Sequence, residues 1–259
     1  MKKLYLISPD KKRKIPDFIN LKNLHSCLST NDYINNNLFE LSKNIPLLVS
    51  ADTQSEGKGR NGHKWTSVGD GGIYISFLLN IKNREYPGLI SLAVAAAAAE
   101  AIRNVVGLDV QLKWPNDIEL AGLKVGGILI ENKLYSDKML AIIGIGLNVN
   151  VEKNQFENGI AKTATSLSVA SGRKIDIEQL ELKISEYLLY FISAMEEKRF
   201  GGILKKYLYY LKHKVGEEIV FTLTGKKVKG SFVRINEDGG LVLMLENGKE
   251  VSVYSGEIY

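Results

Sequence analysis

The sequence predicts an α+β fold, in which a mixed β-sheet flanked by helices is followed by a small C-terminal β-barrel. Two observations favour the sheet and its helices: short apolar runs end at Gly, Asn or Pro, and longer stretches carry apolar residues at helical spacing. A third favours the barrel, because the pattern changes after Val215–Gly216 to short alternating runs separated by turns. We therefore expect a first domain at residues 1–213 and a second at residues 214–259.

The N-terminal part of the first domain is expected to place two strands around a loop, followed by a helix. The first twenty or so residues, with the basic run Lys11–Lys14, lack a sustained apolar period and are expected to form an arm or a first strand. Strand-like runs at Leu47–Val49 and Ile73–Leu79 flank a glycine-rich, basic segment that should be a loop. Ser91–Val106 contains five consecutive alanines and suits a buried helix that ends at Gly107.

The remaining elements follow from the same patterns. Apolar runs at Val110–Leu112, Val125–Ile130 and Met139–Ile145 are typical of central strands. Asp176–Met195 and Ile203–Leu211 have helical spacing and should close the first domain. The second domain is expected to contain four short strands, at Glu218–Thr222, Val228–Ile235, Gly240–Leu245 and Glu250–Tyr254.

Composition indicates a globular protein and narrows its chemistry. With 259 residues, 45% of them hydrophobic, the chain can bury a full core. Cys27 is the only cysteine, so intramolecular disulfides and multi-cysteine metal sites are excluded, and three scattered histidines argue against a zinc site. The apolar run Leu4–Ile7 is too short for a signal peptide and we expect no membrane span, hence a soluble cytoplasmic protein. The formal charge of +5 suits a phosphate-bearing partner without establishing one.

The first segment with chemical meaning is the glycine-rich stretch Gln54–Trp65. Its glycines expose backbone N–H groups, and Lys58, Arg60 and Lys64 add positive charge, so it can wrap a phosphate or a carboxylate. It is not a Walker A loop, because no Gly-Lys-Ser/Thr follows at the required spacing, and it does not match the dinucleotide fingerprint. Taken alone, the pattern favours a flexible surface turn.

Two further segments place charge at strand ends. Lys113–Asp117 combines a cation, an aromatic ring, a proline, an amide and a carboxylate, although ordinary Pro-Asn-Asp turns are common. In Lys124–Glu131 a lysine precedes a Gly-Gly pair, which leaves room for a ligand beside it. A hairpin from Val110 to Ile130 would bring both lysines and Asp117 to one end. We therefore expect an anion site between Lys124 and the glycine-rich loop.

A fourth segment, Gly144–Asn150, ends a strand with glycines and asparagines. The amide of Asn148 can both donate and accept hydrogen bonds, which suits the edge of a purine. The alternative interpretation is an ordinary turn that ends the strand.

In order and spacing, these four segments resemble the biotin–protein ligase family. The hallmarks of that family are a Gly-Arg-Gly-Arg-x-Gly loop followed by tryptophan, Lys-Trp-Pro-Asn-Asp, and a lysine before Gly-Gly-Ile-Leu-x-Glu. Ser29–Asp32, Thr165–Leu167 and the closing Ser255–Ile258 also fit, so the resemblance covers about residues 21–259. It implies a class II synthetase-like catalytic domain with a C-terminal SH3-like barrel.

The resemblance implies where biotin binds. The turn before the first helix would hold the ureido group, for which neutral hydrogen-bond partners are suitable. The glycine-rich loop would cover biotin and the adenylate phosphate, and close when ligand neutralises its charges. The implied biotin contacts are Ser29, Thr30, Asn31, Gln54, Lys58, Gly59, Arg60, Lys124 and Gly127.

The resemblance also implies the nucleotide contacts and the catalytic residues, which are Lys124, Arg60 and Asp117. Lys124 would stabilise the charge that develops when the biotin carboxylate attacks the α-phosphate. Asp117, with Asn116, is a candidate to hold Mg²⁺, but Asp117 could instead orient or deprotonate the acceptor amine, and both roles stay open. The implied ATP and adenylate contacts are Lys58, Arg60, Trp65, Lys113, Asn116, Lys124 and Asn148.

Some positions depart from the family pattern or allow two interpretations. Lys58 and His63 stand where arginines are typical, and lysine lacks bidentate geometry, so we expect weaker retention of the adenylate. Trp65 suits either stacking on adenine or burial in the core. Ser29 begins a stretch that is also typical of a helix N-cap.

The function implied by the resemblance is a two-step ligation. Biotin and Mg-ATP would give biotinyl-5'-adenylate, from which biotin passes to a lysine of a biotin carboxyl carrier protein domain. The alternatives are a lipoate–protein ligase of the same fold, whose Arg-rich Gly-Gly-Gly stretch and His-Asp pair we do not find, and a basic nucleic-acid-binding protein. About twenty residues precede the resemblance, too few for a helix-turn-helix domain, so neither DNA nor a membrane is an expected partner, whereas a homodimer is.

Overall fold

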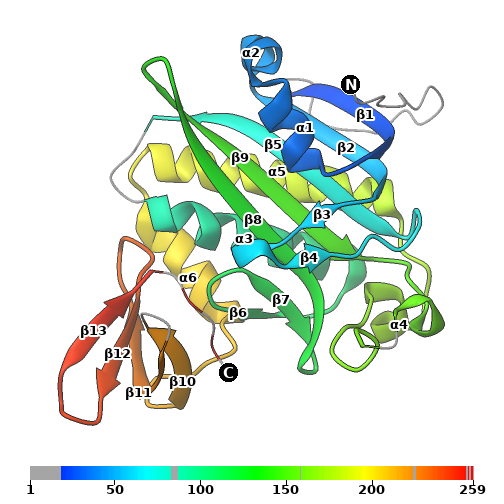
Figure 1. Cartoon of the computed structure of the whole chain (residues 1–259). Helices are drawn as coiled ribbons and strands as arrows, with labels where there is room; N and C mark the ends of the chain where they lie inside the picture. The colour runs from blue at the N-terminus through cyan, green and yellow to red at the C-terminus, as the bar shows by residue number, and fades with distance from the viewer. Residues whose placement is uncertain are drawn as a thin grey trace.

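A seven-stranded mixed sheet organises the first domain, in the order β1-β2-β5-β9-β8-β7-β6 (Figure 1). The computed structural model describes residues 19–82, 87–157, 159–223, 226–254, 256 and 258, so Lys11–Lys14 and the motif residues Ser255 and Glu257 lie outside the described residues. The sheet strands are β1 Asn20–Cys27, β2 Leu47–Gln54, β5 Gly72–Ile81, β6 Gln111–Lys113, β7 Asp117–Leu120, β8 Leu123–Tyr135 and β9 Lys138–Asn148. The helices are α1 Thr30–Asn36, α2 Leu38–Leu41, α3 Pro87–Val106, α4 Leu167–Ser171, α5 Ile177–Glu196 and α6 Phe200–Tyr210.

The sheet separates two hydrophobic clusters because side chains alternate between the faces of a strand. On β5, Ile75 and Phe77 belong to the large cluster beneath α3 and α5, whereas Leu78 belongs to a smaller cluster with Ile34 of α1. Only β1 and β2 pair in parallel, and the other neighbours in the sheet are antiparallel. The prediction of a mixed sheet flanked by helices is confirmed, and α1 and α3 lie on opposite faces (Figure 1).

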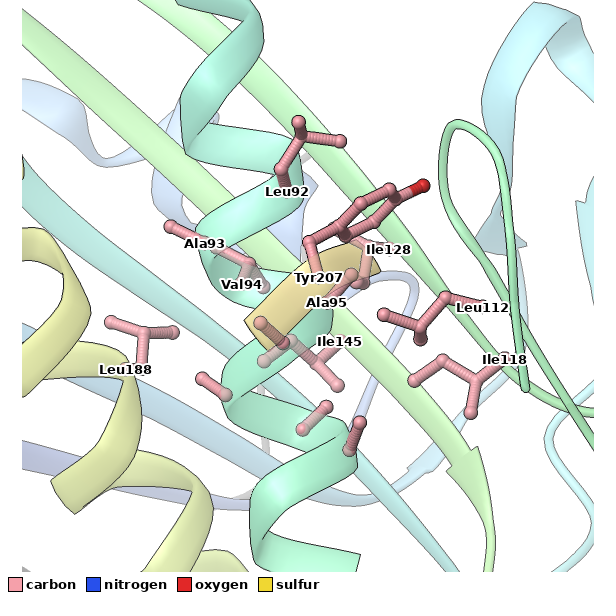
Figure 2. Close-up of a cluster of buried hydrophobic side chains, with 14 of the residues drawn as sticks. Leu92, Ala93, Val94, Ala95, Leu112, Ile118, Ile128, Ile145, Leu188 and Tyr207 are labelled. Carbon is pink, nitrogen blue, oxygen red and sulfur yellow. The ribbon is translucent and has the colours of Figure 1, made fainter. Parts of the chain in front are cut away.

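Helix α3 is the central core helix, and its small residues let the sheet and the outer helices approach it closely. All five alanines from Ala95 to Ala99 are buried, and Figure 2 shows Leu92 to Ala95 beside Ile145 of β9 and Leu188 of α5. The expectation that no run approaches the length of a membrane span was wrong. By length and composition alone, Gly88–Val106 is long and apolar enough to cross a membrane. That helix is largely buried inside the protein, where it serves as the core helix of the fold.

The C-terminal residues form a separate four-stranded antiparallel sheet, β10 Glu218–Leu223, β11 Lys226–Ile235, β12 Leu241–Leu245 and β13 Glu250–Val253. This sheet contacts the first domain through the β11–β12 turn. Trp114 Nε1 donates to Gly239 O at 3.3 Å, and a Cβ on Gly239 would lie 2.7 Å from the carbonyl carbon of Gly88. The close approach, together with a φ of +88°, requires glycine at position 239.

Two local predictions have different outcomes. Helix α3 does end before Gly107, whose φ is +81° and whose N–H donates to Arg103 O at 3.0 Å. The single hairpin expected from Val110 to Ile130 is instead two consecutive hairpins, because a turn with positive φ at Ala121 and Gly122 separates β7 from β8. The second turn allows Lys124 to fold back beside Asp117.

The buried hydroxyl of Tyr207 predicts a stabilising substitution. Tyr207 lies in the core cluster of Figure 2, its hydroxyl has no hydrogen-bond partner among the described residues, and burial raises its pKa well above the usual range. Tyr207→Phe should therefore raise the free energy of unfolding by about 1 kcal/mol in urea titrations. Tyr210→Phe is the matched control, since Tyr210 Oη donates to Glu100 at 3.0 Å and its loss should lower stability by about 1 kcal/mol. Equal effects of the two variants would contradict this explanation.

Candidate active site

One cavity of about 370 Å³ lies where the glycine-rich loop, the start of α1 and the β6–β7 turn meet over the central sheet. Its floor belongs to β5, β8 and β9, at Ile75, Gly127–Leu129 and Gly144–Gly146. Segments that are far apart in the sequence therefore converge. The predicted site residues that line the cavity are Ser29, Thr30, Asn31, Gln54, Lys58, Gly59, Arg60, Trp65, Lys113, Asn116, Asp117, Lys124 and Gly127.

One end of the cavity is a neutral hydrogen-bonding wall at the start of α1. Ser29 is the N-cap, because its side chain accepts from the N–H of Asp32, and it also lines the cavity, so its predicted contact with biotin stays a prediction. The backbone N–H of Thr30 donates to Gln54 Oε1 at 2.8 Å, and the Thr30 hydroxyl lies 3.1 Å from the same oxygen. Helix α1 and strand β2 are thus fixed to each other at the wall.

Behind this wall, a buried serine connects Thr30 to Asn31. Ser76 Oγ on β5 lies 2.7 Å from Thr30 Oγ1 and 2.6 Å from Asn31 Oδ1. Asn31 Nδ2 donates to Glu131 Oε2 on β8 at 2.8 Å, and Asn35 donates to the same oxygen at 3.2 Å. The side chain of Asn31 is therefore hydrogen-bonded at both of its polar atoms within the protein.

The glycine-rich loop is a short hairpin of β3 Gly57–Lys58 and β4 Lys64–Trp65 that is tethered on both sides of the cavity. Lys58 Nζ lies 2.7 Å from Asp32 Oδ1 on α1, and this hydrogen bond raises the lysine's pKa. On the other side, Arg60 donates to Asn116 Oδ1 at 3.0 Å, and Asn116 donates to Ile128 O at 3.2 Å. The two tethers hold the loop across the cavity.

Trp65 packs on bare backbone of the sheet. A Cβ on Gly146 would lie 2.7 Å from Trp65 Cε2, and a Cβ on Gly127 would lie 3.5 Å from Trp65 Cζ3. Trp65 Nε1 is buried without a hydrogen-bond partner in the described part of the chain, and Lys124 Nζ lies 6.0 Å from the centre of the ring. Trp65 is thus partly buried against the sheet and also lines the cavity, and its stacking on adenine stays a prediction.

Lys124 of β8 and Asp117 of β7 form an ion pair at the cavity, with Lys124 Nζ 2.7 Å from Asp117 Oδ1. The main chain of Lys124 is also held, because its N–H donates to Thr163 O and its carbonyl accepts from Thr165 N–H. These bonds give the Thr165 segment a structural role, since it anchors the strand that carries Lys124.

The charge of the cavity is strongly positive. The described residues that line it include one carboxylate, that of Asp117, and five basic side chains, those of Lys58, Arg60, Lys64, Lys113 and Lys124. A surplus of fixed cations at a site with glycine-exposed backbone suits an anionic ligand. The arrangement can bind phosphate or carboxylate groups beside a neutral hydrogen-bonding wall.

One predicted residue does not reach the cavity. Asn148 is buried and donates from Nδ2 to Thr165 O at 3.2 Å, so it joins β9 to the segment before α4. Asn148 thus ends β9 and ties it to the Thr165 segment, and its predicted contact with the nucleotide stays a prediction.

Several residues at or behind the cavity were not predicted as site residues from the sequence. Gly144 and Gly146 occur in a segment that it singled out, where glycines at alternate positions of a strand could have indicated a bare surface. Gly256 and Ile258 line the cavity from the C-terminal residues, and their motif gave no signal of that proximity. Ser76 appears as an ordinary polar residue in an apolar strand.

Two family models match this chain. Residues 25–148 match the model described as Biotin/lipoate A/B protein ligase family, and residues 214–259 match the one described as Biotin protein ligase C terminal domain. These matches define the class of protein to which the fold and the cavity correspond.

Within this class, the solved structures and curated relatives that resemble the chain include biotin protein ligases. A biotin protein ligase from Aquifex aeolicus, in complex with biotin and ATP, superposes with a TM-score of 0.79 at 31% identity and covers 93% of this chain and 97% of that chain. The bifunctional ligase/repressor BirA of Bacillus subtilis is 34% identical over 219 residues, which are 82% of this chain and 65% of that relative. The human biotin–protein ligase is 27% identical over 226 residues, 84% of this chain and 31% of its own length. The chain belongs to the biotin protein ligase family.

The packing of Trp65 predicts that position 146 accepts no side chain. Gly146→Ala should displace the indole, lower the melting temperature by several degrees and shift tryptophan fluorescence, because the added Cβ would lie 2.7 Å from Trp65 Cε2. Gly127→Ala is the matched control, since its Cβ would make only ordinary contacts with Trp65 and Lys124. If Gly146→Ala keeps the wild-type spectrum and stability, the indole does not depend on this bare surface.

Proposed function

We propose that this protein joins biotin to ATP as biotinyl-5'-adenylate and then transfers the biotinyl group to a lysine of an acceptor protein. The observation that carries the proposal is the convergence of a neutral hydrogen-bonding wall and five basic side chains in one cavity. A wall without charge suits an uncharged ring, and the basic side chains suit the carboxylate of biotin and the phosphates of ATP. The biotin and ATP in the Aquifex relative's complex support the same assignment.

In the first step, a carboxylate oxygen of biotin forms a bond to the α-phosphorus of ATP, and pyrophosphate leaves. Two anions approach each other, so fixed positive charge lowers the barrier. Lys124, held by Asp117 and by its own main chain, and Arg60, held by Asn116, would supply that charge with little reorganisation. In the second step, the acceptor amine attacks the acyl carbon, AMP leaves, and the amine loses a proton.

Magnesium fits this site as a companion of the triphosphate. In the described residues, no group of three or more His, Cys, Asp or Glu side chains is arranged to hold a metal ion by itself. Mg²⁺ commonly takes one or two carboxylates with phosphate oxygens and waters, and Asp117 offers one such carboxylate. The amide of Asn116 is engaged at both polar atoms by Arg60 and Ile128, whereas Asp117 pairs with Lys124 through Oδ1 and has a second carboxylate oxygen, so Asp117 is the side chain that would hold the ion.

Further parts of the proposal concern the setting of the reaction. We propose that the acceptor is a biotin carboxyl carrier protein domain, that two chains pair as a homodimer in the cytoplasm, and that the functional division lies between residues 213 and 214. The separate C-terminal sheet supports the division. Gly256 and Ile258 at the cavity support a contribution of this second part to the site.

The proposed first step predicts a biotin-dependent exchange reaction. Labelled pyrophosphate should enter ATP only when biotin is present, and lipoate should not replace biotin. Lys124→Ala should slow this exchange about 10²- to 10³-fold, as expected when one fixed charge is removed from a transition state. Lys229→Ala removes an exposed lysine paired with Glu218 on the C-terminal sheet and should leave the rate unchanged. Exchange without biotin would refute the proposed function, and a wild-type rate in Lys124→Ala would refute the role of Lys124.

The placement of Asp117 predicts that it acts in the first step. Asp117→Asn should slow exchange, because it weakens the hold on Mg²⁺ and on Lys124, and a higher concentration of Mg²⁺ should restore part of the rate. Transfer from preformed biotinyl-5'-adenylate to the acceptor should remain close to wild type. Normal exchange with slow transfer would assign Asp117 to the acceptor amine instead.

A further inference from the structure

Behind the neutral hydrogen-bonding wall, a chain of hydrogen-bonded side chains has fewer donor protons than oxygen–oxygen contacts. Three oxygen–oxygen contacts connect its members: Asn31 Oδ1 to Ser76 at 2.6 Å, Ser76 to Thr30 at 2.7 Å, and Thr30 to Gln54 Oε1 at 3.1 Å. The two hydroxyl groups supply one proton each, and the two amide oxygens can only accept. One contact therefore lacks a donor.

Both ends of this chain are fixed as acceptors. Thr30 N–H donates to Gln54 at 2.8 Å, which requires the oxygen of that amide to face Thr30. Glu131 Oε2 lies 2.8 Å from Asn31 Nδ2, and a carboxylate requires the NH₂ group of Asn31 to face it. The oxygen of Asn31 must then face Ser76, which donates its proton there across the shortest of the three contacts.

The missing donor therefore affects Thr30, which belongs to the neutral wall. With the Ser76 proton committed to Asn31, the Thr30 hydroxyl can donate either to Ser76 Oγ or to Gln54 Oε1, but not fully to both. Thr30 and Gln54 line the cavity, whereas Ser76 is fully buried and Glu131 does not line it. The wall thus presents oxygen lone pairs that call for an N–H group from a ligand.

We propose that Glu131 is a positioning residue that makes this wall selective for a ligand ring with N–H donors, by holding Asn31 in the orientation that leaves the chain one proton short. The inference rests on the proposed function and deepens it. The cyclic urea of biotin carries two N–H groups, whereas the dithiolane ring of lipoate carries none. Glu131 acts through Asn31, Ser76 and Thr30 without touching the ligand.

Glu131→Gln tests the proposal because it changes the donor count with almost no change in shape. A glutamine at this position can donate one N–H to Asn31 Oδ1 and the other to Asn35, whose amide turns its oxygen toward it. The NH₂ group of Asn31 then turns toward Ser76. Each of the three contacts then has its own donor, so Gln54 Oε1 is filled by the N–H and hydroxyl of Thr30 and Thr30 Oγ1 keeps one free lone pair instead of two. The dissociation constant for biotin, measured by calorimetry without ATP, should rise about tenfold, which is the loss of about 1.4 kcal/mol. The dissociation constant for ATP alone should not change.

Asn35→Ala is the matched control for this measurement. It removes the second hydrogen bond to Glu131 Oε2 but keeps the carboxylate and its bond to Asn31, so biotin should bind within about twofold of wild type. Binding of lipoate should be the same in wild type and Glu131→Gln, because its ring offers no N–H to the wall. Equal weakening of biotin and ATP in Glu131→Gln would indicate a general structural defect and overturn the proposal.

Ser76→Ala tests the same proposal independently, so the test does not depend on whether the Glu131→Gln variant folds. Without the serine, the Thr30 proton is committed to Gln54 Oε1, so biotin affinity should fall by a similar factor, and adding Glu131→Gln should cause no further loss. Wild-type affinity in Ser76→Ala, or a second tenfold loss in the double variant, would overturn the inference. A wild-type protein that binds no biotin would refute the proposed function and this inference together, whereas normal biotin binding in Glu131→Gln would refute the inference alone.

Discussion

The site depends on two positions of β9 that carry no side chain. A Cβ on Gly144 would collide with Asn31 Oδ1, and a Cβ on Gly146 would lie 2.7 Å from the indole of Trp65. Helix α1 therefore rests on the sheet at Gly144, and the glycine-rich loop rests on it at Gly146. Because these two segments both line the cavity, its width depends on how closely each can approach bare backbone.

The two walls divide recognition from charge stabilisation. On the α1 side, Thr30, Asn31 and Ser76 are buried and joined by short hydrogen bonds to β5 and β8, an arrangement that resists reorganisation. Among the basic residues, Lys58 and Lys124 remain partly exposed and each pairs with one carboxylate, whereas Arg60 donates to the amide of Asn116. A buried neutral network distinguishes ligands by their donors and acceptors, whereas partly exposed cations attract any anion of suitable size. The neutral wall, and not the basic residues, should then decide which acid is activated.

Much of the fold could be predicted because its elements have strong periodicity. Helix α5 was expected at Asp176–Met195 and spans Ile177–Glu196, with Asp176 as its N-cap. The site was harder to predict, because spacing along the chain shows that Lys113, Asp117 and Lys124 are near one another but not which atoms meet. The hydrogen bond of Asn148 to Thr165 could not be predicted, because Thr165 lies in a segment whose path no local pattern reveals. Ser76 was overlooked for the same reason, since a serine within an apolar strand becomes informative only when its buried neighbours are known.

Lys58 illustrates how a departure from the family pattern is accommodated by its surroundings. A lysine offers a point charge on a flexible stem, whereas an arginine would offer a planar group with paired donors. In this structure, Asp32 holds Lys58 Nζ at 2.7 Å, and Asp32 is itself fixed by the N-cap bond to Ser29. The Lys58 side chain is about half exposed, so this ion pair contributes little to the stability of the fold. Its effect is on orientation, because the pair ties the glycine-rich loop to helix α1 and keeps the Lys58 ammonium at the edge of the neutral wall.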